Sequence, residues 1–143
     1  MKTTARNQFR GTVKAVHNGA VYSDVVLDIG EGVEIVANIT KEAVDDLRLV
    51  PGQEAIALIK SSFVILTTDT NIRVSARNRL KGTVTEVLRG AVNSEVKLLL
   101  VGSSGRILTS ILTNESVTEL KIAQGTPCVA LIKASHVLIA VND

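Results

Sequence analysis

The chain contains the same sequence pattern twice, and this duplication constrains its fold more than any other feature. Residues 4–13 read Thr-Ala-Arg-Asn-Gln-Phe-Arg-Gly-Thr-Val, and residues 75–84 read Ser-Ala-Arg-Asn-Arg-Leu-Lys-Gly-Thr-Val. Two further blocks recur in the same order: Gly-Ala-Val at 19–21 and 90–92, and Ala-Leu-Ile-Lys followed by Ser-Ser at 57–62 or by Ala-Ser at 130–135. Such self-similarity indicates a duplicated structural module. We therefore predict a first module at residues 1–70, a second at 71–143, and two copies of any site they carry.

Composition limits the classes of protein that these modules can form. Of the 143 residues, 45% are hydrophobic but only 2% are aromatic, which predicts a core of aliphatic side chains. Modules this small gain stability by packing on each other or by forming an oligomer. No apolar run approaches the ~20 residues of a membrane span, and Met1-Lys2-Thr3-Thr4 lacks the apolar stretch of a secretory signal. With a single cysteine, we expect no internal disulfide, no membrane partner and a cytoplasmic location.

Both halves predict the same order of secondary structure. Runs of β-branched residues, separated by glycine, proline and asparagine, predict five strands in each half. These strands are expected at residues 10–17, 21–29, 33–39, 53–59 and 63–67, and again at 81–88, 92–101, 106–112, 127–132 and 136–141. A short helix is expected between the third and fourth strands, near 40–47 with Thr40 as N-cap and near 114–120 with Thr113 as N-cap.

Five strands with one helix between the third and fourth are the elements of an OB-type barrel. The predicted fold is therefore mostly β, with two tandem OB-like five-stranded β-barrel modules that each carry one short helix. The fourth and fifth strands of the first half are expected to join tightly through residues 60–62.

The repeated opening motif places a hydroxyl and a guanidinium two residues apart. These pairs are Thr4 with Arg6 and Ser75 with Arg77. Residues two apart project to the same side of an extended segment, so each pair can donate several hydrogen bonds to one anionic oxygen group. The alternative is a terminal strand with a surface arginine.

Two other repeated positions offer donors to an anion. The entries to the predicted helices carry Thr40 and Thr113, where backbone N–H groups favour negative charge, although a threonine there also serves as an ordinary cap. Lys60 and Lys133 follow apolar strands, and the alternative for each is a solvent-exposed turn. Together, an arginine and a lysine supply two positive charges, surrounded by hydroxyl and N–H donors and without a base. This combination indicates a binding site for a small tetrahedral oxyanion and no reaction centre.

The same residues resemble a known module. The Ser-Ala-Arg-Asn opening before Lys-Gly-Thr-Val, the Gly-Ala-Val-Asn-Ser-Glu-Val run at 90–96 and the Ala-Leu-Ile-Lys-Ala-Ser run at 130–135 resemble the Mop (molybdopterin-binding-like) module. Their tandem arrangement resembles the di-Mop molbindins, which are cytoplasmic molybdate-binding proteins. The resemblance implies an OB-like fold, a homotrimer of two-module chains, and molybdate or tungstate held between modules for storage or buffering, with no further cofactor.

The resemblance also implies which residues bind the oxyanion. Its Ser-x-Arg, helix-entry Thr-x-x-Ser and Lys-Ser motifs fall on Thr4, Arg6, Thr40, Lys60, Ser61, Ser75, Arg77, Thr113, Ser116, Lys133 and Ala134. Ala43 stands where the other half has Ser116, and Ala134 stands where it has Ser61, so the two site types are expected to differ in affinity. A second type of oxyanion site, around the symmetry axis, is implied at Gly19, Val21, Gly90, Val92 and Asn93.

Other functions find less support in these residues. OB barrels bind single-stranded nucleic acid through aromatic side chains, and only Phe9, Tyr22 and Phe63 are present, with a net charge of +2. We therefore expect no nucleic-acid partner. A regulatory, ligand-sensing module is the other alternative, although the residues contain no helix-turn-helix or Walker sequence.

An enzyme or a bare metal-cation site is not expected. Asp24 and Glu95 occupy equivalent positions, but both fit a solvent-facing place within a strand. His17 and His136 align with leucine and phenylalanine, which indicates packing, and Cys128 aligns with an alanine, which indicates a small core residue. These residues assemble neither a metal site nor a nucleophilic triad.

Overall fold

The computed structural model describes residues 2–102 and 105–142, and the first half forms the predicted elements. They are β1 (Asn7–Asn18), β2 (Tyr22–Asp28), β3 (Glu34–Thr40), α1 (Lys41–Leu47), β4 (Glu54–Ile59), the single 3₁₀ turn η1 (Ser61–Phe63) and β5 (Ile65–Thr67). The second half repeats them as β6 (Asn78–Arg89), β7 (Asn93–Leu100), β8 (Ile107–Thr113), α2 (Asn114–Glu119), β9 (Pro127–Ile132), η2 (Ala134–His136) and β10 (Val137–Ala140). The mostly β, two-module architecture is thus confirmed. β1 and β6 begin at Asn7 and Asn78, three residues before the predicted starts at 10 and 81.

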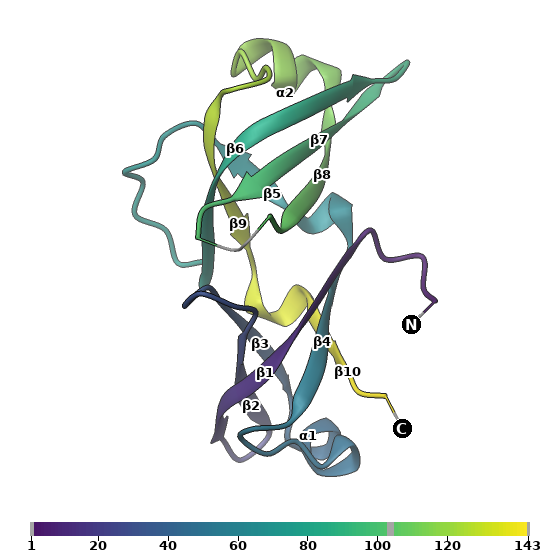
Figure 1. The fold of residues 1–143 in the computed structure, drawn as a ribbon, viewed down its shortest axis with the longest axis vertical. Helices are drawn as coiled ribbons and strands as arrows, with labels where there is room; N and C mark the ends of the chain where they lie inside the picture. Colours follow the sequence, from purple (N-terminus) through teal and green to yellow (C-terminus); the bar gives the residue numbers. More distant parts are fainter. Residues whose placement is uncertain (1, 103–104, 143) are drawn as a thin grey trace.

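Each sheet contains four strands from one half of the chain and one edge strand from the other half. The strand orders are β10-β4-β1-β2-β3 and β5-β9-β6-β7-β8, so β10 completes the first sheet and β5 the second. Figure 1 shows the exchange: β10 lies in the lower lobe beside β4, and β5 lies in the upper lobe. The two sheets therefore do not correspond to the two sequence repeats. The boundary near residue 70 divides the repeats in the sequence, and as a boundary between domains it stays a prediction.

One short turn joins the fourth and fifth strands of the first half, as expected, but the two strands do not pair with each other: β4 pairs with β1 and β10, and β5 pairs with β9. Here Lys60 has φ −66 and Val64 has φ −89, and the chain between them forms η1, in which the Phe63 N–H donates to the Lys60 carbonyl at 3.0 Å. This turn carries the chain to the other sheet, where the Ser110 hydroxyl donates to the Val64 carbonyl at 2.7 Å.

Both helices begin as predicted. The Thr40 hydroxyl accepts the N–H of Ala43 at 3.1 Å, and the Thr113 hydroxyl accepts the N–H of Ser116 at the same distance. These bonds satisfy N–H groups that have no partner within the first helical turn. Among the described residues, neither helix has the length and apolar character needed to cross a membrane.

One aliphatic core runs through both lobes. Its largest fully buried side chains include Leu27, Ile35, Ile59, Leu98, Leu108 and Ile132. Cys128 lies in this core at 1% exposure, as its alignment with an alanine predicts. The burial of side chains from both halves in one cluster gives the exchanged strands a common apolar layer to pack on.

Two buried asparagines join the lobes. Asn7 exchanges two hydrogen bonds with the backbone of Thr109 on β8: its Oδ1 accepts the N–H at 2.7 Å, and its Nδ2 donates to the carbonyl at 2.8 Å. Asn78 makes the same pair of bonds with Val36 on β3, at 2.7 and 2.8 Å. Each carboxamide thus acts like one peptide unit of a sheet. This explains why asparagine ends the repeated opening motif in both halves.

Candidate functional site

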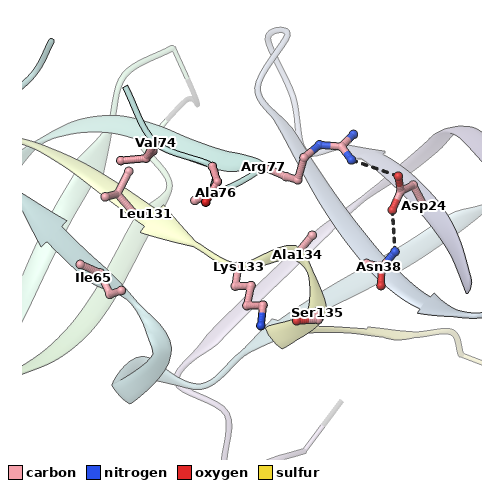
Figure 2. A pocket seen from close by; sticks show the side chains of 11 residues that line it. Asp24, Asn38, Ile65, Val74, Ala76, Arg77, Leu131, Lys133, Ala134 and Ser135 are labelled. Carbon is pink, nitrogen blue, oxygen red and sulfur yellow. Dashed lines mark hydrogen bonds and ion pairs between the residues drawn. The ribbon is translucent and has the colours of Figure 1, made fainter. Parts of the chain in front are cut away.

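A pocket of about 560 Å³ lies where the segment before β6 meets η2 and the first sheet. Ser75 and Arg77 line it from the opening motif of the second half, and Lys133, Ala134 and Ser135 line it from the Lys-Ala-Ser motif. Figure 2 shows these side chains with Asp24 and Asn38 from the first half. The pocket therefore gathers two of the predicted motifs and adds residues that the motifs do not contain.

Strand register brings the two motifs together. Asn78 on β6 pairs with Ile132 on β9 in an antiparallel ladder. The residue before Asn78 is Arg77 and the residue after Ile132 is Lys133, so the two cationic residues flank the same end of the ladder. The first half has the same register, in which Asn7 pairs with Ile59. Arg6 and Lys60 flank the end of that ladder in the same way.

In the pocket, Arg77 is bound to a carboxylate. Its Nη1 donates to Asp24 Oδ2 at 3.1 Å, and Asn38 Nδ2 donates to the other Asp24 oxygen at 2.9 Å. The bond from Asn38 is the main cause that lowers the pKa of Asp24, and Arg77 lowers it further against the opposing effect of burial. Figure 2 shows the guanidinium directed toward Asp24, whereas the Lys133 ammonium points away from this pair. Arg77 and Lys133 thus line one pocket without converging on one point.

The first half repeats this ion pair with a different acid. Arg6 Nη2 binds Glu95 Oε1, and Glu95 is the residue that aligns with Asp24. The side chains of Asp24 and Glu95 lie on the strand face opposite the buried one, as expected, but the ion pairs leave them only 26% and 17% exposed. The occurrence of an acid at the same place in both repeats was the sequence signal for this pairing.

The predicted helix-entry residues lie in a different pocket. Thr113 and Ser116 line a cavity of about 280 Å³ together with Ser62. The Thr113 hydroxyl donates to the Ser116 hydroxyl at 2.8 Å. Two N–H groups at the start of α1 are already bonded, since the Lys41 N–H donates to the Val21 carbonyl at 2.8 Å and Thr40 caps the helix. Within one chain, the helix entries are therefore not joined to the pocket of Arg77 and Lys133.

The two lysine turns meet each other through their aromatic residues. Phe63 and His136 occupy equivalent positions, and their rings stack with centroids 4.2 Å apart. Lys60 Nζ lies 5.5 Å from the centroid of the Phe63 ring, while Ser61 is buried at 7% exposure. The prediction that His136 serves packing is confirmed. The stack places the turn of Lys60 next to the turn of Lys133.

The glycines of the Gly-Ala-Val runs have a structural cause. The Gly19 N–H donates to the Tyr22 carbonyl and the Gly90 N–H to the Asn93 carbonyl, both at 2.9 Å. A Cβ on either glycine would lie 2.4 or 2.7 Å from that carbonyl oxygen, so the turn requires glycine. A second type of oxyanion site at these runs stays a prediction.

Among the described residues, no group of histidine, cysteine and acidic side chains could hold a metal cation.

The fold and pocket define a tandem OB-type protein whose repeated motif gathers cationic and hydroxyl groups at the junction of its halves. Residues 3–66 and 74–139 each match the model of the TOBE domain, and the chain belongs to the TOBE domain family. Among solved structures, it is 44% identical to the cytoplasmic molybdate-binding protein ModG with molybdate bound, with a TM-score of 0.94 over 99% of this chain and 100% of that chain.

The alignments with curated relatives cover nearly all of this chain but only about half of each relative. The chain is 46% identical over 144 residues to the molybdenum transport protein ModE of Herbaspirillum seropedicae, covering 100% of itself and 53% of that protein. It is 41% identical over 141 residues to the molybdenum-pterin-binding protein MopA of Rhodobacter capsulatus, covering 98% of itself and 52% of that protein. The chain thus spans about half the length of the curated relatives it matches. The resemblance to tandem Mop-type modules is confirmed.

Proposed function

We propose that this chain is a cytoplasmic binding protein for molybdate or tungstate, which it stores or buffers between the modules of a homotrimer. The observation that carries the proposal is the likeness to ModG along the full length of both chains, with molybdate bound in that structure. The pocket supplies fitting chemistry, since Ser75, Arg77 and Lys133 offer hydroxyl, guanidinium and ammonium donors to a tetrahedral dianion. Binding is passive in this proposal, so the chain performs no catalysis and needs no cofactor.

Assembly of several chains is part of the proposal because one chain keeps its motifs apart. Thr113 and Ser116 lie in one pocket, and Arg77 and Lys133 line another. A second copy that brings its helix entry beside a Ser-x-Arg segment would complete the set of donors. In the proposed assembly, the oxyanion then replaces its hydration shell with groups from two chains.

Exposed apolar side chains give the assembly a surface to bury. Val21 and Val92, at equivalent positions, are 65% and 70% exposed, and Tyr22 is 59% exposed. In the proposed assembly, contact between chains would remove these three side chains from water, which the fold of one chain leaves exposed. The second type of oxyanion site, at Gly19, Val21, Gly90, Val92 and Asn93, belongs to the same proposal because these residues lie at those exposed runs.

Ligand sensing within a regulator is a second candidate function. The chain is 30% identical over 141 residues to the DNA-binding transcriptional dual regulator ModE of Escherichia coli (strain K12), and it spans 52% of that protein. In this alternative, the modules bind the same oxyanion and pass the signal to another part of a longer polypeptide. Oxyanion-dependent DNA binding by the natural full-length product would favour sensing over storage.

Binding of single-stranded nucleic acid is not proposed. Phe9 is 2% exposed, and the Phe63 ring is engaged by His136 and Lys60. Tyr22 is thus the one ring of the three that is exposed without a stacking partner, whereas OB folds bind single strands by stacking successive bases on several aromatic side chains.

Isothermal titration of the purified protein with molybdate, tungstate and sulfate tests the proposal, on a sample whose mass is measured by light scattering. We expect saturable heat with molybdate or tungstate, little with sulfate because its smaller ion fits the cavity less well, and the mass of a trimer. No heat with molybdate or tungstate at any accessible concentration would refute the proposed function.

Two substitutions test the site. Arg77→Ala and Lys60→Ala are each expected to weaken molybdate binding at least ten-fold, because a hydrogen bond to a charged group contributes about 1.5–3 kcal/mol. Arg73→Ala is the matched control, since Arg73 is an exposed arginine that precedes the opening motif and lines neither pocket described above. Unchanged folding by circular dichroism separates lost binding from lost structure. Normal affinity in Arg77→Ala would remove the centre of the site.

A further inference from the structure

The arginine of each opening motif is held by a carboxylate from the opposite half of the chain. Arg77, which precedes β6, binds Asp24 on β2, and Arg6, which precedes β1, binds Glu95 on β7. The acids differ in type but occupy equivalent positions, so the arrangement occurs twice with independent residues. Repetition of this kind indicates a feature of the module and not an accidental contact of one surface side chain.

These carboxylates stand in the place of an anionic ligand. A guanidinium offers its N–H groups in a fixed fork, and a carboxylate or an oxyanion uses the same groups. The Arg77 side chain is 55% exposed, so its guanidinium can turn from Asp24 toward an ion that enters from solvent. Asp24 also adds a negative charge to the pocket, where it repels an arriving dianion.

The second cation of the pocket has no such partner. Lys133 makes no ion pair among the described residues and points away from Asp24 in Figure 2. With Arg77, Lys133 and Asp24 present, the pocket carries a net charge of about +1, which does not match a dianion. Removing the contact between Arg77 and Asp24 would leave both cations able to bind the ligand.

The two carboxylates differ in the partner that remains to them when the arginine is not bound. Asp24 keeps the hydrogen bond from Asn38, 2.9 Å away, when Arg77 leaves. Glu95 has Ile111 opposite it in the strand ladder, where Asp24 has Asn38, so Glu95 gains no equivalent bond. Asp24 therefore has a hydrogen-bond donor in both states, while Glu95 has no such side chain opposite it in the ladder.

We propose that Asp24 and Glu95 are internal counter-ions of Arg77 and Arg6, and that an oxyanion binds by taking each guanidinium from its carboxylate. This inference rests on the proposed function, which supplies the ligand, and it assigns to the two acids a role in setting affinity. The opposing model is that the acids align the arginines for the ligand. The two models predict opposite effects when the carboxylate charge is removed.

The test is molybdate titration of the full chain with Asp24→Asn, Glu95→Gln and both changes together. Asparagine at 24 keeps the shape and the oxygen that accepts from Asn38, and it removes both the charge and the oxygen that accepts from Arg77. Asp46→Asn is the control for net charge, because Asp46 is exposed on α1. We expect the double variant to bind molybdate about five-fold more tightly than the unaltered protein, and the control to bind as that protein does.

The outcomes separate this inference from the proposed function. Binding by the unaltered protein with equal or weaker binding by the double variant overturns the inference and leaves the proposed function standing. Absence of binding by every form overturns both. A second readout needs no variant: the carboxyl ¹³C signals of Asp24 and Glu95 must shift when molybdate is added to the unaltered protein. If the carboxyl signals of Asp24 and Glu95 do not shift when molybdate saturates the protein, the oxyanion does not take the guanidinium groups from these carboxylates.

Discussion

Replacement of Asn7 or Asn78 by alanine tests how the two halves of the chain are held together. Both side chains are 1% exposed, and each bonds to one peptide group of a strand in the other half. Alanine removes the carboxamide and leaves a backbone N–H and a carbonyl without their partner. The replacement leaves the turns, the helix caps and the aliphatic core unchanged.

The magnitude follows from the environment of the stranded groups. A buried polar group without a partner costs about 1–3 kcal/mol, and each substitution strands two. Thr109, the partner of Asn7, is 6% exposed, so water cannot replace the lost bonds there. Val36, the partner of Asn78, is half-buried, which gives water partial access. We therefore expect Asn7→Ala to lower the free energy of unfolding by about 3–5 kcal/mol and Asn78→Ala by about 2–3 kcal/mol.

Urea unfolding at one fixed protein concentration measures this difference, followed by circular dichroism and with the slope of the transition compared among variants. Asn71→Ala is the matched control, because Asn71 is exposed in the segment between β5 and β6, and its stability should stay within about 0.5 kcal/mol. A loss below about 1 kcal/mol in Asn7→Ala, or a larger loss in Asn78→Ala, would refute the reasoning.

Two further predictions concern titrating groups. The pKa of Asp24 lies below its ordinary value of 3.8, so Asp24 stabilises the fold above that pH and loses this effect as the pH falls through its folded-state pKa. Asp24→Asn should therefore flatten the loss of stability below about pH 4 in acid unfolding curves, and a curve as steep as that of the unaltered protein would contradict it. Burial raises the pKa of the Cys128 thiol, which is 1% exposed. A thiol reagent at about pH 8 should modify Cys128 only after unfolding in denaturant, so rapid reaction of the folded protein would be the contrary result.

The repeat and the local patterns were sufficient to predict the elements of this fold. Strand and helix positions depend on which residues fit an extended ladder or a helical turn, and these preferences act over a few residues. Thr40 and Thr113 are capping residues for the same local reason. The motifs around Arg77 and Lys133 were also recognisable, because their residue types alone indicate an anion.

The exchange of β5 and β10 could not be predicted in the same way. Because the two halves are near copies, β5 presents a similar pattern to β4 and to β9, and sequence periodicity does not distinguish these pairings. Only the three-dimensional path of η1, together with contacts such as that of Ser110 with Val64, selects the opposite sheet.

The partners of the candidate site were hidden for a related reason. Asp24 is far from Arg77 in sequence, and an acid within a strand is most often a solvated residue. Its bond to Arg77 depends on how the two sheets face each other, which no local preference encodes.

By itself, the sequence determined two similar β-modules, their helices and the repeated set of cationic and hydroxyl groups, because short-range preferences and side-chain chemistry decide these properties. Only the tertiary structure decided which half completes which sheet and that Asp24 and Glu95 bind the motif arginines. Those features arise from contacts between segments distant in sequence, whose free energies depend on burial and geometry that exist only once the chain has folded.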